Sequence, residues 1–230
     1  MIYNNPALWL RKQIDPVFAN NTWEQIVKSC QTNKVPETWC VGDQKVMVIG
    51  DVDYPIDIIG KNHDDYADGS GKAPLTFQMH DCYATKYVMD DATVSEYIWE
   101  YSAIRTIYLP AIAALMPSEV QDGIKEVEKK TAVGTIGNNV INTIAESLFL
   151  LSEIEVFGTV GQSNSGEGKQ YSYYSAGGSK IKNLGGSAII WGERSPCAYS
   201  KTANCVVGTN GQQLSGDIGY QRGVAFAFCF

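Results

Sequence analysis

The chain has 230 residues, of which 44% are hydrophobic and 19% charged, and its net charge at pH 7 is −7. This composition is ordinary for a globular protein and excludes wholesale disorder, and the length suits one large domain or a domain with an appendage. The acidic balance and the lack of any basic cluster exclude a nucleic-acid groove, and no apolar run reaches the roughly 18 residues that cross a bilayer.

The N-terminal region is expected to contain a docking arm followed by the start of one domain. Residues 1–20 hold a short apolar stretch between proline-containing turns and lack the layout of a secretory signal. We expect them to form an arm, and residues 21–230 to form a single domain. Thr22 and Gln25 have the capping-box spacing, which predicts a helix that ends near Thr32–Lys34.

The middle of the chain is predicted to alternate strands and helices. Residues 43–51 and 54–60 read as a hairpin, and residues 74–80 as a further strand. Apolar residues at helical spacing predict a helix over 94–109, punctuated by the following proline. Residues 118–130 are charged and predict a short helix.

The second half is predicted to be mainly sheet and loop. Residues 134–142 look like a turn-rich connection, and residues 148–157 are either a buried strand or a helix–strand junction, which periodicity does not decide. Residues 158–187 read as loop. In residues 191–230 apolar residues alternate with stretches of small polar residues and glycine, which we expect to be surface loops. The sequence ends with the apolar run GVAFAFCF, which predicts a core strand that closes the sheet. The fold class is therefore α+β, with helices early and a mostly antiparallel sheet late.

Few residues suit metal or acid–base chemistry. His63 and His80 have no partner at ligand spacing, so a structural or solvated role is favoured for both. The loop with Asp64, Asp65 and Asp68 is explained by an Asp- and Gly-rich turn, while calcium binding stays open as an alternative because hard oxygens suit that ion.

The cysteines also favour a structural interpretation. There are six, irregularly spaced and without a CxxC pair, so free buried thiols are expected and Cys197–Cys205 is the one pair worth testing for a disulfide. Without an elbow motif or a nucleophile–base pair, we expect no enzymatic activity, no cofactor and no metal. A third, weaker hypothesis gives Cys197 and Cys205 a catalytic role. The motif Trp191 to Arg194-Ser195-Pro196 predicts a structural corner, in which the arginine stacks on an aromatic ring or pairs with a carboxylate and aims the loop that follows.

Six motifs occur together in the order of one known family. They are NTWEQI (21–26), GKNHDDYADGSGKAPLTFQMHDC (60–82), LFLLSEIEVFG (148–158), GEGKQYSYY (166–174), W..RSP (191–196) and the terminal GVAFAFC. Together they make residues 21–230 resemble a domain family found in bacterial and prophage proteins, often encoded near phage tail genes. Its C-terminal part is similar to C-type lectin-like folds, which include the variable proteins of diversity-generating retroelements and the formylglycine-generating enzymes. The resemblance implies a C-type lectin-like fold closed by the C-terminal strand, with display loops in residues 191–222.

The same resemblance implies a set of ligand-contacting positions. In the retroelement proteins, mutagenesis directed at adenines varies Asn-type codons, and the residues here that such codons can produce are Gly192, Ala198, Tyr199, Ser200, Thr202, Asn204, Leu214, Ser215, Asp217 and Tyr220. The tyrosines 171, 173 and 174 would add aromatic contact area. Lys201, Gln212, Gln213 and Gln221 are not products of these codons. The family carries a bulky apolar pair where Gly192 and Glu193 stand, so the chain departs from its pattern there.

These expectations define a leading function and an alternative. The leading one is a non-enzymatic receptor-binding protein, or adhesin, of a phage or prophage, made in the host cytoplasm without a signal peptide and located in the virion. It would bind a host cell-surface protein or glycan, contact other tail proteins through residues 1–20, and form a homo-oligomer, without nucleic-acid binding or membrane insertion. The alternative is a structural virion component, a decoration or tail adaptor protein, whose loops contact neighbouring subunits.

Overall fold

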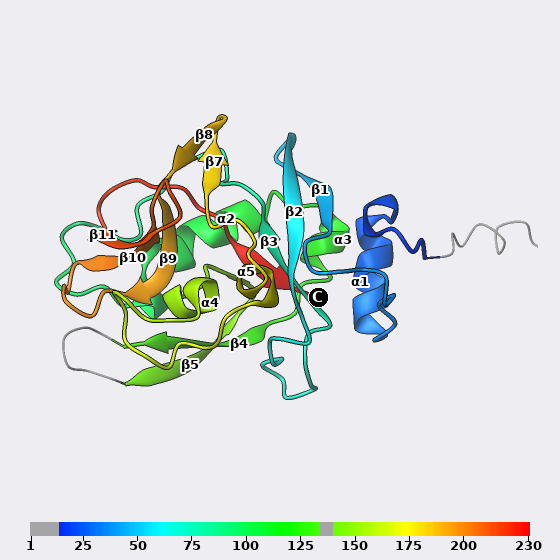
Figure 1. Cartoon of the computed structure of the whole chain (residues 1–230), viewed down its shortest axis with the longest axis horizontal. Coiled ribbons are helices and arrows are strands. Elements are labelled where there is room, and N and C mark those ends of the chain that lie inside the picture. The colour runs from blue at the N-terminus through cyan, green and yellow to red at the C-terminus, as the bar shows by residue number, and fades with distance from the viewer. Residues whose placement is uncertain (1–13, 134–139) are drawn as a thin grey trace, which may run out of the picture.

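An antiparallel sheet of five strands forms the centre of the computed structural model, which describes residues 14–133 and 140–230. The strand order is β1–β2–β3–β12–β6 (Figure 1). The predicted hairpin is confirmed, because β1 and β2 pair directly and turn at Gly50 and Asp51, which both have positive φ. The strands of this sheet are β1 (Gln44–Ile49), β2 (Val52–Lys61), β3 (Leu75–Met79), β12 (Ala227–Cys229) and β6 (Leu148–Phe149).

The last strand lies in the interior of this sheet and of the hydrophobic core. Residues 224–230 are all fully buried. Phe228 stacks on Phe77 with ring centroids 5.3 Å apart, and the Tyr66 hydroxyl donates to the Phe230 carbonyl oxygen at 2.6 Å. The predicted core strand is therefore confirmed. The expectation of a closed sheet is wrong for the described residues, because β12 pairs with β3 and β6 while the outer strands β1 and β6 stay unjoined.

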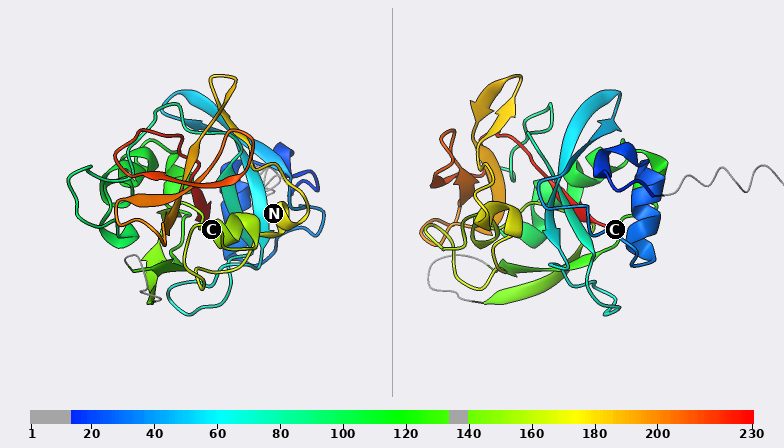
Figure 2. Two further views of the ribbon diagram at one scale, coloured as in Figure 1. Left: turned by 60° about the vertical axis from the view of Figure 1, so that its left-hand side comes forward. Right: turned by 45° about the vertical axis from the view of Figure 1, so that its right-hand side comes forward.

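Three smaller antiparallel sheets surround the central one. The largest has the order β11–β10–β9 and lies at the end of the molecule opposite α1 (Figures 1 and 2). A register shift interrupts the β9–β10 pairing between Asn204 and Val206. The strands are β9 (Trp191–Pro196), β10 (Ala203–Val207) and β11 (Gln213–Asp217), then the pairs β4 (Val127–Ala132) with β5 (Ile141–Glu146), and β7 (Lys182–Leu184) with β8 (Ser187–Ile189).

Short helices occur along the whole described chain. The capping box that begins α1 is confirmed: the Gln25 amide donates to the Thr22 hydroxyl at 3.2 Å, and the Thr22 amide donates to Oε1 of Gln25 at 2.8 Å. The helices are α1 (Trp23–Gln31), α2 (Leu109–Ala113), α3 (Ser118–Gln121), α4 (Glu153–Phe157) and α5 (Ser172–Ser175). The protein is thus mixed α and β with mostly antiparallel sheets, but the predicted separation of early helices from late strands is wrong, since β1–β3 precede α2–α5.

The helical region near the middle of the chain begins later and continues further than predicted. Residues 94–98 contain no helix, and helical structure starts with a 3₁₀ turn at Trp99–Tyr101 and a π-helix at Ile104–Tyr108 that leads into α2. Pro110 is the second residue of α2 and directly follows the π-helix, so the helical segment continues through the proline instead of ending at it.

Two other predictions for the middle of the chain need correction. The charged stretch 118–130 is helical only in α3, because Val127, Lys129 and Thr131 alternate with exposed residues and form β4 instead. Of the predicted connection at 134–142, residues 134–139 lie outside the described part, and Ile141 begins β5.

The later segments resolve one open alternative and overturn one prediction. Residues 148–157 are a strand followed by a helix, β6 and then α4, which confirms the junction of strand and helix. The predicted loop at 158–187 contains α5 and β7, and β8 begins at its last residue, Ser187.

The boundary of the predicted N-terminal arm also moves. Residues 1–13 lie outside the described part, but residues 14–20 are in place, and Phe18 is buried against Trp39 and Phe77 with ring centroids 5.3 and 6.1 Å away. Residues 14–20 thus belong to the domain. In the ranges 14–133 and 140–230, the structure contains no helix that is long and apolar enough to cross a membrane.

Candidate functional site

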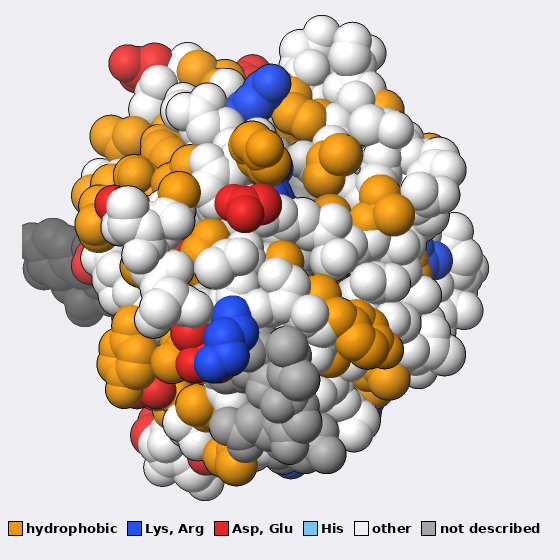
Figure 3. Space-filling view, turned by 90° about the vertical axis from the view of Figure 1, so that its left-hand side faces the viewer, with side chains coloured by type: hydrophobic (Ala, Val, Ile, Leu, Met, Phe, Trp, Pro, Cys, Tyr) orange, Lys and Arg blue, Asp and Glu red, His pale blue; other side chains and the backbone are white. Residues whose placement is uncertain are grey.

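The sequence-predicted contact residues lie on β9–β11 and the loops between them, at one end of the molecule. Figure 3 shows this end as mostly uncharged, with apolar side chains dispersed among polar ones. Tyr199 and Tyr220 are the aromatic residues of the set, and their exposed fractions are 72% and 73%. We call the part of the set that is exposed or half-buried the display surface: Ala198, Tyr199, Ser200, Thr202, Leu214, Ser215, Asp217 and Tyr220.

Two members of the predicted set are buried, and their assignment as ligand contacts is wrong. Gly192 is buried in β9, and a Cβ there would lie 2.8 Å from Sδ of Met89, so any larger residue would displace the Met89 side chain. Asn204 is fully buried in β10, the middle strand of its sheet, and its side-chain amide donates to the carbonyl oxygens of Glu193 and Cys205, both at 2.8 Å. Both residues belong to the scaffold beneath the display surface.

Arg222 fastens the loop that carries Tyr220. Its guanidinium is buried and donates through Nη1 to Oδ1 of Asn204 at 3.0 Å, through Nε to the Tyr220 carbonyl oxygen at 3.3 Å, and through Nη2 to the Asp217 carbonyl oxygen. The loop 217–222 is therefore tied to β10 by one side chain. A loop held in this way presents its exposed residues with little conformational entropy left to lose on binding.

The loop that carries Tyr199 is held by backbone hydrogen bonds. The Ala198 amide donates to the Gln162 carbonyl oxygen and the Tyr97 amide donates to the Lys201 carbonyl oxygen, both at 2.7 Å. The Ile218 amide donates to the carbonyl oxygen of Thr202 at 3.0 Å. The two display loops are consequently joined to each other and to the rest of the domain.

Replacing Asn204 with leucine is expected to lower the free energy of unfolding by about 1–3 kcal/mol, because it removes the acceptor of Nη1 of the buried Arg222 and the side-chain donor to the Glu193 and Cys205 carbonyl oxygens. Urea denaturation measures this change. Tyr199→Ala is the matched control, since its exposed ring should leave the transition nearly unchanged. Equal stability of the two variants would contradict the scaffold role of Asn204.

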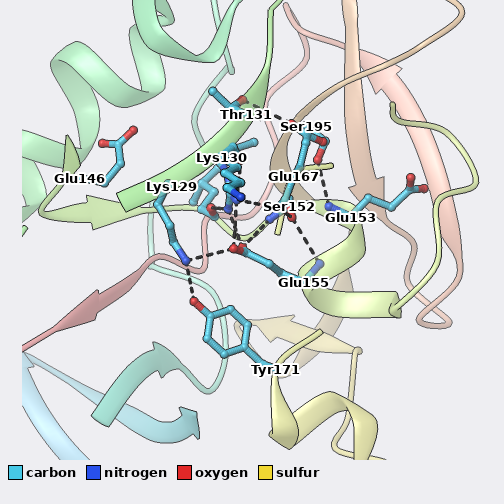
Figure 4. A network of polar contacts seen from close by, with 12 residues as sticks. Lys129, Lys130, Thr131, Glu146, Ser152, Glu153, Glu155, Glu167, Tyr171 and Ser195 are labelled. Carbon is cyan, nitrogen blue, oxygen red and sulfur yellow. Dashed lines mark hydrogen bonds and ion pairs between the residues drawn. The ribbon is translucent and has the colours of Figure 1, made fainter. Parts of the chain in front are cut away.

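A buried network of charges supports the display surface from below. Arg194 of β9 is fully buried and pairs with Glu155 of α4 in a bidentate manner, at 2.5 Å for Nη1–Oε2 and 3.0 Å for Nη2–Oε1. Nζ of Lys129 lies 3.0 Å from Oε1 of Glu155 and 2.7 Å from the Tyr171 hydroxyl (Figure 4), and 2.5 Å from Oδ1 of Asp64. The corner predicted from the W..RSP motif is confirmed, with the arginine paired to a carboxylate.

The protonation of this network follows from its pairing. Burial raises the pKa of Asp64, but Lys129 and the hydrogen bond from Thr76 outweigh it and lower the pKa to about 2. Burial likewise raises the pKa of Glu155, while Arg194 and Lys129 bring it below its ordinary value. Both carboxylates are thus ionised at neutral pH, and the network holds two positive and two negative charges away from water.

The calcium alternative for the acidic loop is not supported by the positions of its carboxylates. Asp64 is buried in the network, whereas Asp65 pairs with Lys72 at 2.7 Å and Asp68 with Lys125 at 3.2 Å. Their carboxylates are directed to three different ammonium groups. Among the described residues no cluster of three His, Cys, Asp or Glu side chains is arranged to hold a metal ion.

Two further glutamates are buried beside the network. Both carboxylate oxygens of Glu193 lack a hydrogen-bond partner among the described residues, and burial, together with Glu153 and Glu167, raises its pKa well above the ordinary value. Glu153 by contrast accepts from the backbone amides of residues 161–163, at 2.8–3.1 Å, and so holds the segment that leads to Gln162. The capping-box spacing of Ser152 and Glu155 is the one sequence signal that pointed to a well-placed glutamate in this region.

The other candidates have structural positions. His63 stacks on Tyr171 with ring centroids 4.0 Å apart, and Nδ1 of His80 lies 2.8 Å from Oδ2 of Asp57. Tyr171 and Tyr174 are buried, so their predicted contribution to a contact surface is wrong. All six cysteines are free; Cys197 and Cys205 are buried, and burial raises the pKa of the Cys205 thiol well above its ordinary value, which disfavours a reactive thiolate.

The amino-acid sequence was compared with models of known protein families. Residues 76–230 match a family model described as Domain of unknown function (DUF6273). The chain belongs to this family. The DUF6273 match begins in β3 and includes Lys129, Glu155 and Arg194 and the whole display surface, while Asp64 precedes it. Searches among curated proteins and among solved structures found no match.

Proposed function

We propose that this DUF6273 protein is a non-enzymatic receptor-binding protein of a phage or prophage, with a C-type lectin-like fold, that presents its display surface to a protein or glycan on a host cell. The observation that carries the proposal is the pair Tyr199 and Tyr220, exposed on loops that the buried Arg222 and a set of backbone hydrogen bonds hold in place. Exposed aromatic rings on anchored loops are typical of recognition surfaces.

The chemistry of the surface agrees with this proposal. Its residues combine two large aromatic rings with small hydroxyl side chains such as Ser200 and Ser215, a mixture that gives contact area from the rings and adaptable hydrogen bonding from the hydroxyls. Such a surface gives modest affinity per copy, and several copies on one particle would raise it through avidity. The predicted homo-oligomer and the contacts of residues 1–20 with tail proteins remain proposals.

The test is a binding screen with a double variant. Tyr199→Ala with Tyr220→Ala should lose about 100-fold or more in affinity for any host-cell glycan or surface protein that the wild type binds, because central aromatic contacts carry most of the energy of such interfaces. Biolayer interferometry on immobilised candidates and adsorption to intact cells measure this loss. The matched control is Tyr101→Ala, which removes an equally exposed tyrosine (70%) outside the display surface.

The alternative of a structural virion component makes a different prediction for the same variants. If the loops contact neighbouring subunits, Tyr199→Ala with Tyr220→Ala would reduce incorporation into particles without changing which cells adsorb them. Unaltered adsorption by correctly assembled particles would contradict the receptor-binding proposal.

A further inference from the structure

A second polar site lies next to the buried network, apart from the display surface. It is an open pocket of about 380 Å³ between the loop that starts at His63, the strand β4 and the glycine-rich segment Gly166–Lys169. Lys129, Asp64 and Glu155 form its floor, and all three are buried. Because the floor residues are fixed by one another, the bottom of the pocket is rigid.

The charges on the floor are already satisfied. Asp64 accepts from Lys129, Thr76 and Tyr171, and Glu155 accepts from Lys129 and Arg194. A ligand therefore interacts mainly with the walls, and their free groups decide its chemistry.

The walls carry more free positive than negative groups. Among the described residues, no ion pair involves Lys130, Lys169 or Glu128, whereas the fourth charged wall residue, Asp65, pairs with Lys72. His63 adds an imidazole whose pKa is lowered by burial, which favours its neutral form as a hydrogen-bond donor and acceptor. The charged wall residues outside any ion pair are thus two lysines and one glutamate, and they lie beside one imidazole.

The backbone adds a further donor. In β4 the Glu128 amide donates to the Asp65 carbonyl oxygen and the Ala132 amide to Oε1 of Glu167, both at 2.8 Å and both away from β5. Alternate residues of an antiparallel strand direct their amides to the same edge, so the Lys130 amide points to the pocket side of β4 as well.

We propose that this pocket binds a small organic acid, whose carboxylate contacts Lys130 and Lys169 and whose hydroxyl or ammonium groups contact Glu128 and His63. The two wall lysines favour a carboxylate on the ligand, and the Glu128 carboxylate and the His63 imidazole favour a second polar group that can donate a hydrogen bond. Acidic sugars and acidic amino acids share this chemistry, and the volume accommodates one such unit. The site is independent of the display surface and of the function proposed for it.

The two histidines of the chain allow a direct test. His63 lines the pocket and His80 does not, so the ring protons of His63 report on binding in NMR spectra while those of His80 serve as an internal reference. The probes are two pairs of compounds: D-glucuronic acid with D-glucose, and L-glutamate with its diamide, L-glutaminamide. In each pair the second compound, called the neutral partner, has an uncharged hydroxyl or amide group wherever the acid has a carboxylate. We expect one acid to shift the His63 signal to saturation, and its neutral partner to bind about tenfold more weakly or worse.

Three single variants complete the test. Lys130→Gln and Lys169→Gln should each weaken binding about tenfold, since each removes one charge-assisted hydrogen bond, and Lys28→Gln on the exposed face of α1 should leave it unchanged. All three side chains are exposed, so the fold should tolerate every change. The proposal is overturned if neither acid shifts His63 at about 10 mM, if acid and neutral partner act alike, or if Lys28→Gln weakens binding as much as the pocket variants.

Discussion

Replacing Arg194 with methionine is expected to lower the free energy of unfolding by about 3–5 kcal/mol at pH 7. The variant leaves the Glu155 carboxylate fully buried with only Lys129 to balance it, and it removes the donor of the carbonyl oxygens of Leu150 and Lys130. Methionine has nearly the length of the arginine stem, so the loss measures the charge and its hydrogen bonds more than a cavity. Urea denaturation followed by tryptophan fluorescence measures the change.

The matched control is Lys72→Met, which breaks an ion pair between the exposed side chains of Lys72 and Asp65 and should alter the stability little. If Arg194→Met lowers the free energy of unfolding no more than Lys72→Met does, the ion pair between Arg194 and Glu155 does not stabilise β9.

The pH dependence of the same variant separates charge from packing. In the wild type the pKa values of Glu155 and Asp64 lie below their ordinary values of 4.5 and 3.8, so their contribution to stability is complete above about pH 5 and is lost as the pH falls toward the folded-state pKa of Asp64, about 2. In Arg194→Met, protonation of Glu155 removes a poorly balanced buried charge and so stabilises the folded protein. The difference in unfolding free energy between wild type and variant should therefore narrow as the pH falls below about 5, whereas a loss of packing alone would leave it constant.

Elements with a local signal could be predicted from the sequence. The capping box at Thr22 and Gln25 defines the start of α1, and the apolar run at the C-terminus predicts the buried strand β12. The hairpin β1–β2 follows from two apolar runs with a short turn between them. In each case the determining residues are close in sequence, so no knowledge of the partner surface is needed.

The parts that depend on distant partners were not predictable in the same way. In the sequence, Lys129 is one lysine in a charged stretch. It becomes the centre of a buried network only because the fold brings Asp64 and Glu155, which are distant in sequence, into contact with it. The burial of Asn204 likewise depends on Arg222 and on β9 and β11, the strands on either side of β10. Asn204 was predicted as a contact residue from the codons that adenine-directed mutagenesis can produce. Those codons contain no information about burial, so the prediction failed at this position.

The opposite stability change is expected for Glu193→Met, which should raise the free energy of unfolding by about 1–4 kcal/mol at pH 8. Both carboxylate oxygens of Glu193 are buried without a hydrogen-bond partner among the described residues, and methionine replaces them with an apolar group of similar length.

The sign of the pH dependence makes this last expectation specific. Burial raises the pKa of Glu193 in the folded protein, so the wild type has its full stability below the ordinary value of about 4.5 and loses it as the pH rises toward the folded-state pKa. Glu193→Met has no such group, and its advantage over the wild type should grow between about pH 4.5 and pH 8. Glu193→Gln is the matched control: it removes the titration but keeps a buried polar group, so it should show the same growth with pH and a smaller total gain. A variant that is less stable than the wild type at pH 8 would mean that Glu193 is ionised and paired in the folded protein, contrary to the structure.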